Sequence, residues 1–295
     1  MKKIIVKQYD AFSIKPGKGN PAGIVLDADN LTDEEMQEIA SKVGFNECAF
    51  PVKSNVADLR IRYFTPGHEM DLCGHATMAT IFALVTEKYI EFKRNLTIET
   101  KAGILSIQLT EEQKTYHMRM EHAKPRFKPF GGSIKDLATS IGITIEDIHA
   151  EYPIVYGNTG IWTLCIPIKN MDAFAKMEPK TTTFPSILKE MPNASLHPFS
   201  LKAFSEDADM HARHFSSPIS GTIQDAVTGT ASGVMGAYVA TYLLPERKGQ
   251  YDLIVEQGQE LDKDGRVIVH VENNEDITIA ITGTAVYVKD IAVYI

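Results

Sequence analysis

Residues Gly74–Val85 read GHATMATIFALV, a stretch in which small and apolar residues occupy nearly every position. A helix of this composition is apolar almost all the way round, so it cannot lie on a surface and must be enclosed by other elements. Gly229–Ala240, GTASGVMGAYVA, repeats the pattern, with a glycine first, small residues next and an apolar helix after them. The two stretches predict two similar halves, each with one buried helix.

Short strand-like runs flank both buried helices, as expected if a sheet encloses each of them. In the first half they are Ile4–Phe12, Ala22–Leu26, Cys48–Val52, Leu59–Phe64, Leu96–Leu109 as a hairpin and Tyr116–Met120. In the second half they are Ile161–Ile168, Tyr251–Glu256, Val267–Val271, Ile277–Ile281 and Ala285–Val288. The pattern predicts an α+β fold of two pseudo-symmetric domains, each a sheet around a central helix, with a cleft between them.

Proline and glycine residues between positions 125 and 132 mark the domain boundary. We therefore predict an N-terminal domain over residues 1–120, to which the C-terminal strand could return, and a C-terminal domain over 121–295. A surface helix is expected to begin after Thr32, because Glu35 completes a capping box, and to end at Gly44.

Composition excludes several classes of protein. The 295 residues are 44% hydrophobic and 23% charged, with a formal net charge of −8, and Lys and Arg are scattered rather than clustered. No 18-residue apolar run occurs, the N-terminus lacks the apolar block of a signal peptide, and the three cysteines form no C-x-x-C pair. We expect a cytoplasmic protein with reduced thiols and with neither nucleic acid nor a membrane as partner.

The beginnings of the two buried helices are candidate anion-binding sites. The first amide hydrogens of a helix have no partner within the helix, and the macrodipole makes that end positive. Gly74 in the first helix and Thr228, Gly229 and Thr230 in the second therefore suit a substrate carboxylate. Water or side-chain caps could equally satisfy these amides.

His75 and Cys73 stand at the first of these helix ends. The positive end of the helix disfavours a protonated ring, so we expect His75 to be a neutral hydrogen-bonding group or a cap of its own helix. Cys73 could have a lowered pKa and act as a nucleophile or base, or it could pack as a small apolar side chain.

Metal binding is not expected from the histidine spacings. His68, Cys73 and His75 lie close together in the sequence, and His211 and His214 form an H-x-x-H. None of these spacings matches a zinc framework, and no H-E-x-x-H occurs. We therefore predict no metal and no cofactor.

Four segments, in this order, resemble the signatures of the phenazine-biosynthesis isomerase-like (PhzF-like) family. They are DAFSIKPGKGNPAGIV (10–25), GFNECAF (44–50), RYFTPGHEMDLCGHATMAT (62–80) and QDAVTGTASGVMGAY (224–238). The resemblance covers almost the whole chain. It implies a fold like that of diaminopimelate epimerase, with each domain a β-barrel around its helix, an active site between the domains and a homodimer.

The resemblance also implies roles for individual residues. Glu47 resembles the family's catalytic acid/base, and His75 and Asp225 resemble its supporting polar residues. The residues expected to bind substrate are Asn20, Cys73, Gly74, Thr228, Gly229 and Thr230. This chain departs from the common pattern beside both acids, with Asn46 and Cys48 around Glu47 and with Gln224 and Ala226 around Asp225. These departures put the substrate in doubt more than the chemistry.

Two reactions fit such a site. Inverting a stereocentre needs an acid and a base on opposite faces; Cys73 resembles one of the two cysteines of the related epimerase, but Thr228 at the other position is too weak an acid. Moving a proton along a conjugated system needs one group, and Glu47 can serve. We therefore predict a cofactor-independent biosynthetic isomerase acting on a small carboxylate. The alternatives are an epimerase or racemase that pairs Cys73 with Glu47, and a non-catalytic ligand-binding or protein-interaction module.

Overall fold

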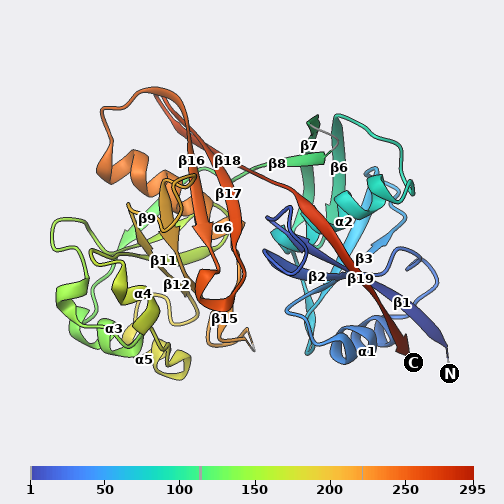
Figure 1. Cartoon of the computed structure of the whole chain (residues 1–295), viewed down its shortest axis with the longest axis horizontal. Coiled ribbons are helices and arrows are strands. Elements are labelled where there is room, and N and C mark those ends of the chain that lie inside the picture. The colour runs from blue at the N-terminus through green and yellow to red at the C-terminus, as the bar shows by residue number, and fades with distance from the viewer. Residues whose placement is uncertain (1, 113–114, 221) are drawn as a thin grey trace. The chain divides into compact units, whose positions relative to one another are not determined.

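The computed structural model describes residues 2–112, 115–220 and 222–295. The chain divides into two compact units, the first formed by Met1–Glu121 with Thr282–Ile295 and the second by His122–Ile281. The C-terminal residues belong to the first unit because the last strand, β19 (Ala285–Tyr294), pairs along the whole of β1 (Lys3–Ala11). Figure 1 shows this antiparallel pair, blue beside dark red.

The first unit is mainly antiparallel sheet with two helices between the strands. Besides β1 and β19, its elements are β2 (Asn20–Ile24), α1 (Asp33–Val43), β3 (Cys48–Val52), β4 (Leu59–Phe64), β5 (Glu69–Met70), α2 (Gly74–Thr86), β6 (Asn95–Thr100), β7 (Gly103–Glu112) and β8 (Thr115–Glu121). Pairing runs in the order β19, β1, β2, β3, β4, β6, β7, β8, with β2–β3 and β4–β6 parallel. The hairpin predicted over Leu96–Leu109 is confirmed as β6 and β7.

Helix α2 is buried as its composition predicts. Every side chain from His75 to Ile81 is buried, and the helix packs against β1, β2, β3 and β19. Helix α1 has one apolar face, with Met36 and Ile39 buried over the sheet. Its predicted capping box is present, since the Glu35 N–H donates to Thr32 Oγ1 at 3.2 Å and the Thr32 N–H donates to Glu35 Oε2 at 3.0 Å. Gly44 ends the helix with a φ of 73°.

The second unit has more, shorter elements. Its strands are β9 (Arg126–Pro129), β10 (Val155–Asn158), β11 (Trp162–Pro167), β12 (Ser195–Ser200), β13 (Met210–Ala212), β14 (His214–Phe215), β15 (Gln224–Asp225), β16 (Gly249–Gln257), β17 (Gly265–Asn273) and β18 (Ile277–Gly283). Its helices are α3 (Ile134–Ser140), α4 (Asp172–Lys176), α5 (Phe184–Ile187) and α6 (Gly229–Tyr238), with short helical turns η1 (Ile145–Asp147), η2 (Thr181–Thr183), η3 (Val239–Leu243) and η4 (Gln259–Leu261).

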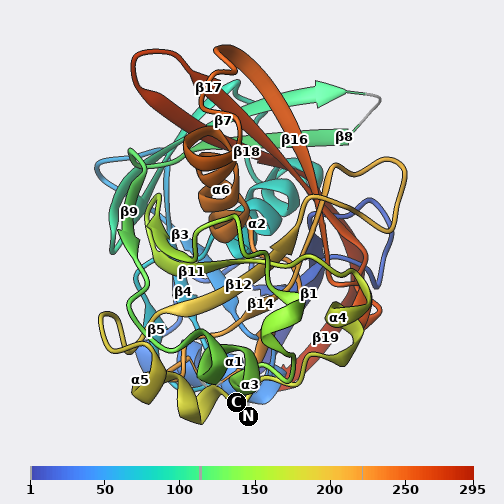
Figure 2. The ribbon, with the colours of Figure 1, turned by 90° about the vertical axis from the view of Figure 1, so that its left-hand side faces the viewer.

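Helix α6 is the second buried helix that the sequence predicts. It packs against β10, β11 and β17, and Ala231–Tyr238 are all buried. Its small residues allow these contacts, since a Cβ on Gly236 would overlap the side chain of Val269 on β17. Helices α3, α4 and α5 gather on one side of the unit (Figure 2), over a core that includes Phe174, Phe184 and Phe215.

The fold is therefore a mixture of extensive sheet and few helices, as expected. Among the described residues, none of the helices has the length and apolar character needed to cross a membrane.

Candidate active site

The first unit brings Glu47, Cys73 and His75 together. Glu47 directly precedes β3, and its carbonyl accepts the Gly23 N–H of β2 at 3.2 Å, which fixes the backbone there. Cys73 and His75 come from the N-terminal end of α2. His75 Nε2 lies 3.2 Å from Glu47 Oε2, and His75 Nδ1 lies 3.4 Å from Cys73 Sγ. The imidazole therefore stands between a carboxylate and a thiol.

This cluster is largely shielded from water. The side chains of His75 and Glu47 are 6% and 15% exposed, and Cys73 is buried. Glu47 Oε2 is a buried atom for which no hydrogen-bond partner occurs among the described residues, so its contact with His75 is electrostatic.

The ionisation of this cluster differs from the sequence expectation. Burial lowers the pKa of His75, but the neighbouring Cys73 and Glu47 outweigh it and raise that pKa well above 6.5. This direction is opposite to the one expected from the helix end alone, because Cys73 and Glu47 lie against the ring. Burial and the Glu47 charge also raise the pKa of Cys73, which is opposite to the lowered pKa that was one of the two alternatives for this thiol.

Tyr63 and Thr77 support the cluster from behind and were not singled out from the sequence. The Thr77 hydroxyl donates to the Cys73 carbonyl at 2.7 Å, and the Tyr63 hydroxyl lies 2.6 Å from Thr77 Oγ1. Both side chains are fully buried. Tyr63 lies inside segment 62–80, which carried the resemblance. Its supporting role cannot be predicted from neighbouring residues, because its partner Thr77 lies on α2 whereas Tyr63 lies on β4.

Asn20 begins β2 and is buried opposite Ala11 of β1. Its strand runs beside β3, the strand that follows Glu47. The preceding Gly19 has a φ of 76°, and a Cβ there would overlap the Ala11 carbonyl, so this turn requires glycine. Asn20 therefore has a fixed place on a strand next to β3, the strand that begins directly after Glu47.

In the second unit, Asp225 and Thr228 are joined at the N-terminus of α6. The Thr228 hydroxyl donates to Asp225 Oδ2 at 2.5 Å. Gln257, at the end of β16, fixes both residues: its Oε1 accepts the Thr228 N–H at 3.2 Å and its Nε2 donates to the Asp225 carbonyl at 3.0 Å. Gly229 and Thr230 follow in the first turn. Sequence reasoning missed Gln257, because this residue comes from a strand distant in the chain.

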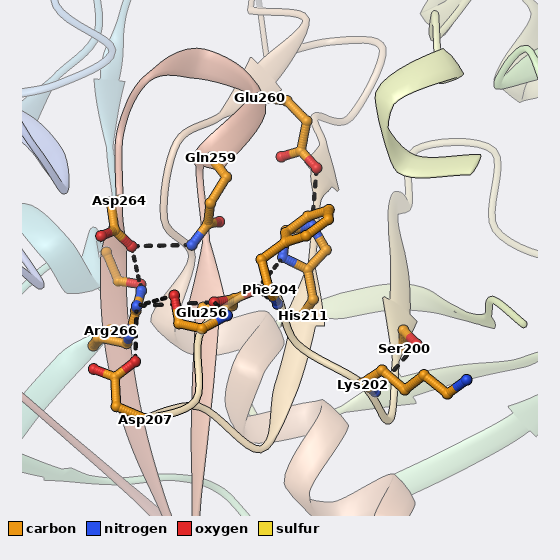
Figure 3. A network of polar contacts seen from close by, with 12 residues as sticks. Ser200, Lys202, Phe204, Asp207, His211, Glu256, Gln259, Glu260, Asp264 and Arg266 are labelled. Carbon is orange, nitrogen blue, oxygen red and sulfur yellow. Dashed lines mark hydrogen bonds and ion pairs between the residues drawn. The ribbon is translucent and has the colours of Figure 1, made fainter. Parts of the chain in front are cut away.

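Glu256, the neighbour of Gln257, belongs to a buried polar network (Figure 3). Its Oε1 accepts the Phe204 N–H at 2.6 Å and lies 3.0 Å from His211 Nδ1, and its Oε2 accepts the Ser205 N–H at 3.1 Å. His211 Nε2 lies 2.9 Å from Glu260 Oε1. Burial lowers the pKa of His211, but the two carboxylates reverse this and raise it. The network anchors the end of β16 and hence Gln257.

The H-x-x-H pair thus serves two different local roles. His211 lies between two carboxylates, whereas His214 on β14 lies opposite Asp225 on β15. Burial lowers the pKa of His214 to about 4, so the ring beside Asp225 is neutral at pH 7. His214 Nδ1 lies 3.3 Å from Nδ1 of His197, another buried histidine.

Comparison with known proteins places these residues in a family context. A family model described as "Phenazine biosynthesis-like protein" (PhzC-PhzF) matches residues 9–290. The chain is 51% identical to the uncharacterized isomerase YfhB of Bacillus subtilis, over 97% of both chains. It is 25% identical to the trans-2,3-dihydro-3-hydroxyanthranilate isomerase of Pseudomonas chlororaphis, over 90% of both.

Solved structures agree with these matches. The phenazine biosynthesis protein of the PhzF family from Bacillus anthracis superimposes with a TM-score of 0.97 at 56% identity, with both chains fully covered. A probable proline racemase from Agrobacterium radiobacter superimposes with a TM-score of 0.65 at 12% identity, covering 99% of this chain and 93% of the other. The second likeness shows that the fold resembles that of racemases and epimerases.

Proposed function

We propose that this chain moves a proton within a small carboxylate substrate without a cofactor. The premise is that the chain belongs to the phenazine biosynthesis-like protein family and is an isomerase. In this proposal Glu47 removes the proton and returns it elsewhere on the same face of the substrate. The observation that carries the proposal is the shielded Glu47 carboxylate, 3.2 Å from His75 and beside the N-terminus of a buried helix.

His75 supports the reaction through its charge. Cys73 and Glu47 raise the pKa of His75, which favours the protonated ring, and in this proposal its positive charge stabilises negative charge that develops on the substrate. The N-terminal turn of α2 at Gly74 adds amide hydrogens for the substrate carboxylate. Loss of one such preorganised donor typically costs about 10²–10³-fold in kcat.

We further propose that each unit is a barrel around its central helix and that the two are pseudo-symmetric. The packing of α2 against β1, β2, β3 and β19, and of α6 against β10, β11 and β17, supports this. Asn20 and Cys73 of the first unit and Asp225, Thr228, Gly229 and Thr230 of the second are proposed to bind the substrate. A homodimer in the cytoplasm stays a prediction; light scattering after size exclusion tests the homodimer.

The assignment is tested by proton exchange in deuterated water. A panel of small amino and hydroxy acids is screened by NMR for deuterium uptake, first with the unaltered chain and then with Glu47→Gln. The variant should lose exchange while keeping its fold. Glu38→Gln is the matched control, since Glu38 is an exposed carboxylate on α1 that pairs with Lys42, and it should exchange normally. Undiminished exchange in Glu47→Gln would rule out the assignment.

The second candidate, a Cys73-dependent epimerase, is favoured only by the 3.4 Å contact between Cys73 and His75. The raised pKa of Cys73 keeps the thiol protonated at pH 7, where it could donate a proton but not remove one. Loss of exchange in Cys73→Ser, with exchange retained in Glu47→Gln, would support the epimerase instead.

A further inference from the structure

Two histidines of the second unit contact each other inside the protein. His197 on β12 is fully buried, and His214 on β14 is 8% exposed. Their Nδ1 atoms lie 3.3 Å apart, and the two strands pair in the sheet (Figure 2). The proposed function uses neither ring, although His214 lies opposite Asp225, one of the residues proposed to bind the substrate.

The contact between the two rings needs one hydrogen. A neutral imidazole has one N–H and one bare nitrogen, so one Nδ1 must donate and the other must accept. Burial lowers the pKa of His197 well below 6.5 and that of His214 to about 4, which favours the neutral form of both rings. Either ring could supply the hydrogen, so two arrangements of tautomers are possible.

The two arrangements differ at His197 Nε2. This nitrogen is buried, and the described part of the chain offers it no hydrogen-bond partner. If His214 supplied the shared hydrogen, His197 Nε2 would carry an unpaired N–H; if His197 supplies it, Nε2 keeps only a lone pair. In protein backbones an orphaned buried N–H is rarer than an under-satisfied acceptor. The same preference makes His197 the donor and His214 the acceptor.

Asp225 favours this arrangement from the other side of the His214 ring. The two residues are directly opposite in the antiparallel β14–β15 pair, so their side chains share one face of the sheet, with Cβ atoms about 4.5–5.5 Å apart. Burial lowers the pKa of His214, and the Asp225 charge raises it, so the carboxylate acts on the ring. An ionised carboxylate only accepts hydrogen bonds, and an N–H at His214 Nε2 suits it better than a lone pair.

We infer that His197 holds His214 in the tautomer with hydrogen on Nε2, and that His214 is a positioning residue for the Asp225 carboxylate. The inference rests on the proposed function, in which Asp225 binds the substrate. The Thr228 hydroxyl donates to Asp225 Oδ2 at 2.5 Å, and a second donor from His214 fixes the orientation of the carboxylate. A neutral donor leaves the negative charge of Asp225 available to a hydroxyl or ammonium group of the substrate.

The first test reads the tautomers without any substrate. In ¹⁵N NMR at pH 7, a ring nitrogen that carries hydrogen and a bare one give well-separated signals. We expect hydrogen on Nδ1 of His197 and on Nε2 of His214, each ring being assigned from the signals that disappear in His197→Leu and His214→Phe. In His197→Leu the remaining His214 signals should move toward the average of the two tautomers. Hydrogen on His214 Nδ1 in the unaltered chain overturns the inference.

Amide side chains separate donation by His214 from simple packing. Glutamine can place an NH₂ group near the histidine Nε2 position, whereas asparagine reaches only the Nδ1 position. His214→Asn and His214→Phe should raise the KM of a true substrate by about 10-fold, the low end for losing a hydrogen bond to a charged group, with kcat nearly unchanged. His214→Gln should restore most of the affinity. A purely structural loss would reduce the active fraction, and hence the apparent kcat, without changing KM.

The matched control is His149→Phe. His149 belongs to the same unit, and its ring stacks on Tyr152 with centroids 4.3 Å apart, a contact that phenylalanine can keep. This variant should leave both the tautomers and KM unchanged. Circular dichroism and thermal melting establish that each variant is folded. Equal KM values in His214→Asn, His214→Phe and the unaltered chain overturn the positioning role while leaving the proposed isomerase intact.

A second signal that needs no substrate keeps the inference separate from the proposed function. The ¹³C resonance of the Asp225 carboxylate should move in His214→Phe and stay near its original position in His214→Gln and His149→Phe. Absence of proton exchange from every compound would count against the isomerase, and the carboxylate resonance would still decide the inference. A resonance that does not respond to His214→Phe overturns it.

Discussion

Replacing Glu256 by Gln should destabilise the second unit strongly. The buried carboxylate accepts the N–H groups of Phe204 and Ser205 and faces His211 Nδ1, at 2.6, 3.1 and 3.0 Å. An amide offers one oxygen in place of two, so its NH₂ group must face at least one of these donors. Removing one partner from a buried ion pair costs about 3–5 kcal/mol, and an unsatisfied buried donor alone about 1–3 kcal/mol.

The assay can report on the second unit alone. The chain has one tryptophan, and Trp162 lies on β11 of that unit, so its fluorescence follows unfolding there. At a urea m-value of about 2 kcal/mol/M, a loss of about 4 kcal/mol lowers the midpoint by roughly 2 M. Glu246→Gln, which removes an exposed carboxylate from the same unit, should change stability by less than about 0.5 kcal/mol.

The pH dependence has a defined sign. The pKa of His211 is raised in the folded chain. The ring therefore stabilises the fold fully at pH values below its pKa in the unfolded chain, near 6.5, and this stabilisation is lost as the pH rises through its pKa in the folded chain. The pKa of Glu256 is lowered: burial alone would raise it, but His211 and the Phe204 N–H outweigh burial. Its contribution is therefore present above the unfolded value near 4.5 and is lost as pH falls through the folded pKa.

The difference in stability between the unaltered chain and Glu256→Gln should therefore be largest at about pH 4.5–6.5 and shrink on both sides. A difference below about 1 kcal/mol throughout, no larger than that of Glu246→Gln, would refute the reasoning from buried pairing.

Three further outcomes are expected. Gln257→Leu, which removes the bonds to the Thr228 N–H and the Asp225 carbonyl, should slow exchange of a true substrate by roughly 100-fold through misplacement of the α6 N-terminus, measured by NMR, and an unchanged rate would contradict this positioning role. Gly236→Ala should destabilise the second unit by about 1–3 kcal/mol through overlap with Val269, and an unchanged urea midpoint would show that the helix can shift. Thr32→Ala should cost about 1 kcal/mol in thermal unfolding by removing the capping box, whereas Thr32→Ser should be nearly neutral.

Several elements could be predicted from the sequence because their signals are local. The capping box of α1 lies within four residues, and the uniformly apolar character of α2 and α6 requires burial whatever surrounds them. The hairpin of β6 and β7 follows from its turn and flanking alternation. For the site, the motif resemblance named Glu47 and His75, which the structure brings within 3.2 Å of each other.

Other features depend on residues far apart in the chain. The return of β19 to β1 moved the end of the second unit, and no pattern within β19 specifies that partner. The raised pKa of His75 could not be predicted from the sequence, because its helix end is visible locally whereas its carboxylate neighbour is not. The partners of His211 lie on β16 and η4, so its H-x-x-H spacing carried no information about them.

The sequence by itself determined the helices α1, α2 and α6, the burial of α2 and α6, most strands and the family of the chain, because periodicity, caps and motifs lie in neighbouring residues. Only the tertiary structure decided which strands pair in each unit, which residues support Glu47 and Asp225, and which carboxylates face the histidines. Strand pairing and electrostatic energy depend on distances between groups that the chain brings together only when it folds, and Coulomb interaction falls with that distance.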